Sequence, residues 1–71
     1  MANIDEIKDR LVEELYSRGE TSYKIAKKVG TSPTMVREWK RKRSAPGAYY
    51  LAVMLEAGVD VVYILTGKRN E

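Results

Sequence analysis

The sequence predicts a compact all-α domain built from five short helices. Apolar side chains recur at the helical spacing i, i+3, i+4, i+7 in most windows, whereas the alternation of apolar and polar residues that marks a strand is weak. Glycines at positions 19, 30, 58 and 67 and the segment SAPG at 44–47 interrupt this pattern, as helix ends do. At 71 residues, the chain (1–71) fits one domain, near the smallest size that a hydrophobic core stabilises alone.

The first predicted helix begins after Asn3, a favourable N-cap, and Glu6 can return a capping-box-like hydrogen bond. It is expected to end with Gly19 in the C′ position. Its apolar stripe is Ile4, Ile7, Leu11, Val12 and Leu15. The second helix, capped by Thr21 or Ser22, is expected to run to about residue 29. Its inward side chains are Ile25, Ala26 and Val29.

Gly30 ends the second helix, and Ser32 caps a third with Pro33 at N1, where the missing N–H costs nothing. Val36 and Trp39 are expected to face inward. A fourth helix is predicted from about residue 46 or 47 to 57. Asp60 can cap a fifth helix over 61–66, after which KRNE (68–71) is predicted to fray.

Composition excludes several classes of protein. Cysteine and histidine are absent, so disulfides, thiolate metal sites and histidine-based catalysis are ruled out. No apolar run reaches the roughly 18 residues of a membrane span, and the N-terminus lacks a signal peptide's apolar centre. We therefore expect a cytoplasmic protein without metal, cofactor, membrane or small-molecule substrate. Carboxylates along an exposed face of the first helix, with no cleft to shift their pKa values, argue against an enzyme. They are Asp5, Glu6, Asp9, Glu13 and Glu14.

Positive charge is concentrated in one third of the chain. Residues 20–43 carry eight basic and two acidic side chains, a balance of +6, whereas the remainder carries five basic and eight acidic ones, a balance of −3. This asymmetry favours a polyanion as the partner, and a solvated lysine-rich helix face is the alternative.

Residues 22–42 fit a helix-turn-helix, two short helices joined by a glycine-containing turn. Ala26 is small where the helices approach, and Gly30 tolerates positive φ in the turn. An ordinary helical hairpin is the alternative. On the third helix, Thr34, Arg37, Glu38 and Arg41 share the outward face. Such a helix can enter the DNA major groove with its N-terminus first. The predicted base-contacting residues are Ser32, Pro33, Thr34, Arg37 and Glu38.

The base contacts differ in chemistry. Arg37 presents a fork for guanine O6/N7, Glu38 an acceptor for cytosine N4, and the hydroxyls suit several base edges. Glu38 can instead pair with Lys42 or Arg41 on its own helix face. The cations of KRKR (40–43) are too many for one base-reading face, so we assign them to DNA phosphates; favourable interaction with the helix C-terminus would explain only one or two. The predicted phosphate-contacting residues are Ser22, Tyr23, Lys24, Lys40, Arg41, Lys42 and Arg43.

Three segments together resemble the helix-turn-helix domain of lambdoid phage repressors of the CI and Cro type and their small bacterial relatives. They are KIAKKVGTSPTMVREWK, the following RSAP, and the ending AGVDVVYILTG. The resemblance covers nearly the whole chain and implies a five-helix DNA-binding domain. Since no cleavable C-terminal domain follows, it favours a small all-helical Cro-like repressor in a bacterial host. Ser22 departs from the family, which often has a phosphate-contacting Gln there.

The fifth helix is apolar on all sides, which a helix packed on one face does not need. We therefore expect a homodimer related by a two-fold axis; a terminal helix buried between the others is the alternative. The predicted dimer residues are Val61, Val62, Tyr63 and Leu65. The expected function is a transcriptional repressor that binds a pseudo-palindromic operator. The alternatives are an antitoxin, whose main partner is a toxin protein, and a helical adaptor that has lost DNA binding.

Overall fold

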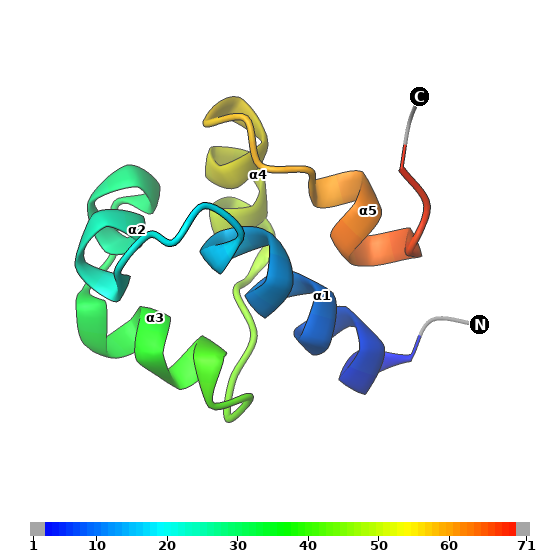
Figure 1. Cartoon of the computed structure of the whole chain (residues 1–71), viewed down its shortest axis with the longest axis horizontal. Coiled ribbons are helices and arrows are strands. Elements are labelled where there is room, and N and C mark those ends of the chain that lie inside the picture. The colour runs from blue at the N-terminus through cyan, green and yellow to red at the C-terminus, as the bar shows by residue number, and fades with distance from the viewer. Residues whose placement is uncertain (1–2, 70–71) are drawn as a thin grey trace.

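The computed structural model describes residues 3–69. These residues form five α-helices joined by short links, and no strand occurs among them. The helices are α1 (Ile4–Tyr16), α2 (Ser22–Val29), α3 (Pro33–Lys40), α4 (Ala48–Glu56) and α5 (Val61–Thr66). Figure 1 shows α2 and α3 stacked at one end of the molecule, α1 running across the middle, and α5 at the other end. The expectation of a compact all-α fold is confirmed.

Four helices begin at predicted N-caps, and three of these are α1, α2 and α3. The Asn3 side chain accepts from the backbone N–H of Asp5 at 2.9 Å. Ser32 Oγ accepts from Met35 N at 3.2 Å, with Pro33 in the first turn of α3. The N-cap of α2 is Thr21 and not Ser22, because Thr21 Oγ1 accepts from the backbone N–H of Lys24, the third residue of the helix. Each cap satisfies a donor that has no partner within its helix.

The end of α1 differs from the prediction. The helix was expected to continue up to Gly19, but it stops at Tyr16 with Ser17 as the C-cap. Ser17 donates from both its backbone N–H and its hydroxyl to the carbonyl of Glu14. This tightens the last turn and closes the helix early, while Gly19 supplies the positive φ (+70°) of the following link. The predicted return bond from Glu6 is also replaced, since its carboxylate lies 3.8 Å from Arg10 Nη1 instead.

The core draws on all five helices. Its largest fully buried side chain is Trp39, whose ring forms a T-shaped pair with the Tyr50 ring, with centroids 5.6 Å apart. The buried apolar side chains are Leu11, Leu15, Ile25, Ala26, Val29, Val36, Trp39, Met54, Val61 and Ile64. The inward residues predicted for α2 and α3 are therefore confirmed. On α1 the predicted stripe is confirmed for Leu11 and Leu15, which are buried in the core, and for Ile7, which packs against it. Val12 is only half-buried, and Ile4, in the first turn, is exposed.

The C-terminal part closes against α1. The predicted fourth helix begins one or two residues later and ends one residue earlier than expected, and Asp60 Oδ1 caps α5 by accepting from Tyr63 N at 3.0 Å. Lys68 and Arg69 were predicted to fray, yet the Arg69 guanidinium pairs with Glu14 of α1 and, at 3.1 Å, with Asp60. Residues 70–71 of that segment lie outside the described residues.

Candidate nucleic-acid interface

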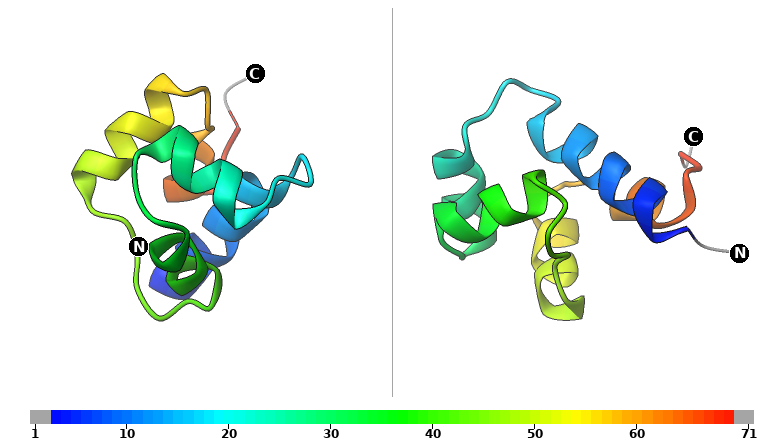
Figure 2. Two further views of the ribbon diagram at one scale, coloured as in Figure 1. Left: turned by 90° about the vertical axis from the view of Figure 1, so that its left-hand side faces the viewer. Right: turned by 90° about the horizontal axis from the view of Figure 1, so that it is seen from below.

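The turn between α2 and α3 sets the angle at which α3 is presented. Gly30 adopts φ +79°, and the carbonyl of Ala26 accepts from both Gly30 N and Thr31 N, at 2.8 and 2.9 Å. This left-handed glycine reverses the chain within three residues, so that α3 starts immediately at Pro33. Seen from below, α3 lies nearest the viewer with α2 behind it (Figure 2).

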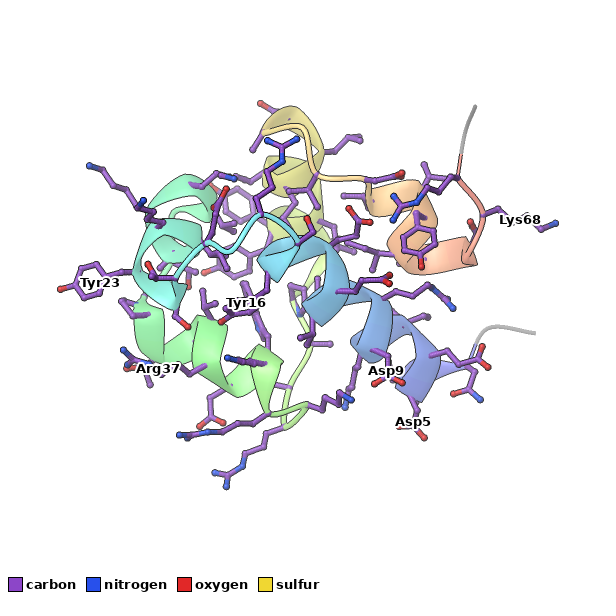
Figure 3. The ribbon with its side chains drawn as sticks, in the orientation of Figure 1. Asp5, Asp9, Tyr16, Tyr23, Arg37 and Lys68 are labelled. Carbon is purple, nitrogen blue, oxygen red and sulfur yellow. The ribbon has the colours of Figure 1, made fainter. Side chains whose placement is uncertain are left out.

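Three of the five predicted base-contacting residues are exposed at the start of α3 or along its outward face. Val36 and Trp39 are buried beneath the helix, whereas Ser32, Thr34 and Arg37 are exposed. The Arg37 side chain points away from the molecule (Figure 3) and makes no ion pair or hydrogen bond within residues 3–69. Pro33 is half-buried. One guanidinium and two hydroxyls are thus held on the open side of a helix whose other side is fixed by the core.

Glu38 is less accessible than its place on the helix predicts. Its side chain is 35 % exposed, and Oε2 is buried without a hydrogen-bond partner. The nearest cation is the Arg43 guanidinium, with Nε 4.0 Å from Oε2. Neither of the partners expected from helix spacing, Lys42 and Arg41, pairs with it, because the chain turns away after α3 and Lys42 reaches α1 instead.

Lys42 ends α3 in an uncommon way. The helix closes with bonds from Lys42 N to Trp39 O and from Arg43 N to Glu38 O, both 3.0 Å. This pattern places its C′ residue in the left-handed region, and α2, α4 and α5 have glycine in that conformation. Here the residue is Lys42, at φ +62°, the one non-glycine residue among 3–69 with positive φ.

Tyr16 of α1 contacts two residues of the predicted phosphate-contacting set, Ser22 and Lys40. The Tyr16 hydroxyl lies 2.6 Å from Ser22 Oγ, and Lys40 Nζ lies 4.6 Å from the centroid of the Tyr16 ring. A cation over an aromatic face is attracted by the ring's quadrupole. Tyr16 therefore brings the start of α2 and the end of α3 together, a role that sequence reasoning missed. Its spacing of four from Val12 could have placed it on the inner edge of α1.

The side chains of Tyr23 and Lys24, near the start of α2, are open to solvent, whereas a lysine near its end is paired. Tyr23 is 73 % exposed and points outward from α2 (Figure 3), beside the exposed Lys24. Lys28 is partly neutralised, since its Nζ lies 2.8 Å from a carboxylate oxygen of Glu20. This hydrogen bond, together with the charge of Lys28, holds the pKa of Glu20 below its usual range.

The predicted dimer residues of α5 divide into two groups. Val61 is only 7 % exposed and packs in the core with Ile64, so its predicted role in a dimer contact is corrected. Val62 and Leu65 are 51 % and 41 % exposed. The spacing explains the division, because residues three apart share a helix face and the consecutive apolar run supplies one such pair to each side.

Tyr63 lies between these two faces and is half-buried. Its hydroxyl donates to Glu13 Oε1 at 2.6 Å, and this bond raises the pKa of Tyr63. The Arg69 guanidinium lies 3.9 Å from the centroid of its ring. The tyrosine is thus engaged on both its hydroxyl and its ring, which leaves Val62 and Leu65 as the accessible apolar side chains of α5 among the predicted four.

An apolar groove of about 170 Å³ lies beside Leu65, between α1, α5 and the segment before α4. Ile4, Ile7, Pro46 and Leu51 line it together with the end of α5. The exposure of Ile4, which the sequence did not predict, is explained by its position on this rim. Exposed apolar side chains that gather around a groove mark contact surfaces more often than those scattered singly.

Comparison with protein-family models, with curated proteins and with solved structures finds no match to this chain. The similarity to lambdoid repressors therefore stays a prediction from the residues quoted above. Among residues 3–69, no helix has both the length and the apolar character needed to cross a bilayer.

Proposed function

We propose that the protein is a sequence-specific DNA-binding transcriptional repressor of the small, all-helical Cro type. In this proposal α3 enters the major groove, two subunits bind a pseudo-palindromic operator, and repression follows from occluding the polymerase, without a catalytic step. The observation that carries the proposal is the outward Arg37 on a helix anchored from below by Val36 and Trp39. A helix fixed in this way can offer its first turns to base edges in the groove, which is about 12 Å wide.

Sequence preference in this proposal comes mainly from Arg37. Its planar fork suits guanine O6 and N7, and a good bidentate contact of this kind discriminates by about 1–3 kcal/mol. Ser32 and Thr34 would contact further base edges, while the half-buried Pro33 could touch a thymine methyl group. Glu38 enters as a weaker candidate, because reading a cytosine requires its carboxylate to leave Arg43.

Affinity in this proposal comes from the cations that surround α3. Residues 40–43 and the start of α2 would neutralise phosphates on either side of the groove, and each such contact releases a counterion. Contacts of this kind position the protein without reading sequence. Replacing a base-reading residue and replacing a phosphate-contacting residue should therefore have different consequences.

Operator symmetry in this proposal comes from α5. Val62, Leu65 and the adjoining groove would form a self-complementary contact across a two-fold axis, placing two copies of α3 in successive major grooves about 34 Å apart. Leu65→Glu should remove the dimer in sedimentation equilibrium and leave a folded monomer. Leu55→Glu is the matched control, because Leu55 is an exposed leucine on α4 that does not line the groove.

The experiment that tests the proposal is selection of bound sites from a random DNA pool, followed by titration of two variants. Arg37→Ala should lose about 1–3 kcal/mol on the selected site and relax the preference at one base position. Lys42→Ala should weaken selected and random duplexes alike and lower the salt slope. A pool that yields no enriched sequence, or equal losses for Arg37→Ala on selected and random DNA, would contradict the proposal.

A further inference from the structure

Residue 42 is tied to α1 through two of its atoms. Its Nζ forms an ion pair with Asp9 Oδ1, and its carbonyl oxygen accepts from Lys8 Nζ at 3.2 Å. The two α1 residues are adjacent in sequence, so neighbouring side chains hold the backbone and the side chain of the same residue. In the KRKR segment, Lys42 is the one cation that pairs with a carboxylate on another helix within the described residues.

The backbone at this corner fixes where the Lys42 side chain starts. Its positive φ of +62° is held by the closing bond to Trp39 O at the end of α3, and the Lys8 bond fixes the carbonyl that follows. The side chains of Lys42 and Asp9 remain 50 % and 59 % exposed. A negatively charged oxygen from solvent can therefore approach the ammonium group and exchange with the carboxylate.

We propose that Asp9 competes with a DNA phosphate for Lys42 and thereby limits the affinity of the interface. This inference rests on the proposed function and adds to it a residue that makes no contact with DNA. When phosphate takes Lys42, one ion pair replaces another, and the Asp9 carboxylate is left unpaired beside a polyanion. The contact then contributes less affinity and less salt dependence than an unengaged lysine would, since release of a DNA counterion is offset by recruitment of a cation to Asp9.

Asp5 provides a matched control on the same helix. It lies one turn before Asp9 and is exposed, and its carboxylate forms no ion pair or hydrogen bond with another residue of 3–69. Both side chains project from the same side of α1 (Figure 3). Asp5→Asn therefore removes the same charge from the same region but leaves the Lys42 pair intact, which separates long-range repulsion from direct competition.

The experiment measures dissociation constants on the selected duplex between about 50 and 200 mM salt, for wild type, Asp9→Asn, Asp5→Asn, Lys42→Gln and the double variant Asp9→Asn/Lys42→Gln. Asp9→Asn should bind about 2- to 5-fold more tightly at 100 mM salt, the range expected for an exposed ion pair. Its salt slope should steepen by up to about one. Asp5→Asn should change affinity less than half as much and leave the slope unchanged.

The double variant isolates the pair. In the Lys42→Gln background, Asp9→Asn should gain no more than Asp5→Asn gains in wild type, because the competed lysine is gone. Thermal unfolding by circular dichroism should show that each variant is folded. Unchanged or weaker binding by Asp9→Asn, or a gain equal to that of Asp5→Asn, would overturn the inference while leaving the proposed function standing. Absence of binding to any duplex by wild type and Asp9→Asn would overturn both.

Discussion

Residue 42 is a lysine in a backbone conformation that favours glycine. Substitutions at this position can therefore test its effect on folding stability separately from its effect on DNA binding. Two substitutions distinguish backbone from side chain: Lys42→Gly relaxes the positive φ (+62°), and Lys42→Ala keeps the conformational cost. Both remove the ion pair with Asp9. The difference in unfolding free energy between them therefore reports the backbone conformation alone.

The magnitude follows from two opposing effects. A non-glycine residue in the left-handed region costs roughly 1–2 kcal/mol, whereas glycine makes the unfolded chain more flexible, which costs about 0.4–1 kcal/mol. Lys42→Gly should therefore be more stable than Lys42→Ala by roughly 1 kcal/mol, or about 4–8 °C in Tm for a domain of this size. Urea unfolding followed by far-UV circular dichroism measures the difference.

Gly30→Ala is the calibrating variant. Gly30 has a similar φ of +79°, and a Cβ added there would meet no atom within 4 Å, so its loss of about 1 kcal/mol also reflects the backbone. DNA affinity completes the test, since Lys42→Gly and Lys42→Ala should weaken binding equally. The reasoning is refuted if Lys42→Ala is as stable as Lys42→Gly, or if Lys42→Gly binds DNA as tightly as wild type.

Three further predictions concern stability. Ser32→Ala should cost about 1 kcal/mol in urea unfolding, because it removes the acceptor for Met35 N at the start of α3. Tyr63→Phe should change the alkaline part of the curve of unfolding free energy against pH. Because the pKa of Tyr63 is raised in the folded state, its hydroxyl stabilises the fold below about pH 10, and this stabilisation is lost as pH rises through the folded-state pKa. Lys28→Met should change the acid part of the same curve, where the wild type loses stability as pH falls. The lowered pKa of Glu20 gives a stabilisation that is present above the unfolded-state pKa of 4.5 and is lost as pH falls through the folded-state value.

Each of these predictions has a result that contradicts it. Ser32→Thr keeps a hydroxyl cap, so a loss as large as that of Ser32→Ala would argue against capping. Tyr63→Phe is compared with Tyr23→Phe, whose ring is exposed; equal alkaline profiles would exclude the Glu13 hydrogen bond as the cause. For Lys28→Met, melting temperatures that stay parallel to wild type down to pH 3 would exclude the pair with Glu20.

The helices and their inner faces could be predicted because the signals are local. Asn3, Thr21, Ser32 and Asp60 act as caps through bonds to residues two or three positions away, and Val36 and Trp39 follow from helical spacing. The end of α1 was mispredicted because the Ser17 hydroxyl competes for a carbonyl near the helix end, which is one of several local choices open to serine.

The rest of the site could not be predicted because it depends on contacts between distant segments. Residues 9 and 42, or 63 and 13, are brought together only by the packing of the helices. Helix spacing offered Lys42 as the partner of Glu38, and the left-handed turn after α3 redirected it to α1. The consecutive apolar run of α5 likewise could not reveal that Val61 would face the core, because every side of that helix has the same character.

The burial of Trp39 has a practical consequence for spectroscopy. It is the one tryptophan in the chain, and its indole packs in the core on the side of α3 opposite Arg37. Selective excitation of the indole therefore reports on a single chromophore, whose emission should shift to longer wavelength only when water reaches the core. Because the indole lies beneath the proposed groove-reading face and not on it, its emission should report unfolding of the domain and stay unchanged when a duplex binds. A variant that has unfolded can thus be distinguished from a folded variant that has lost DNA affinity.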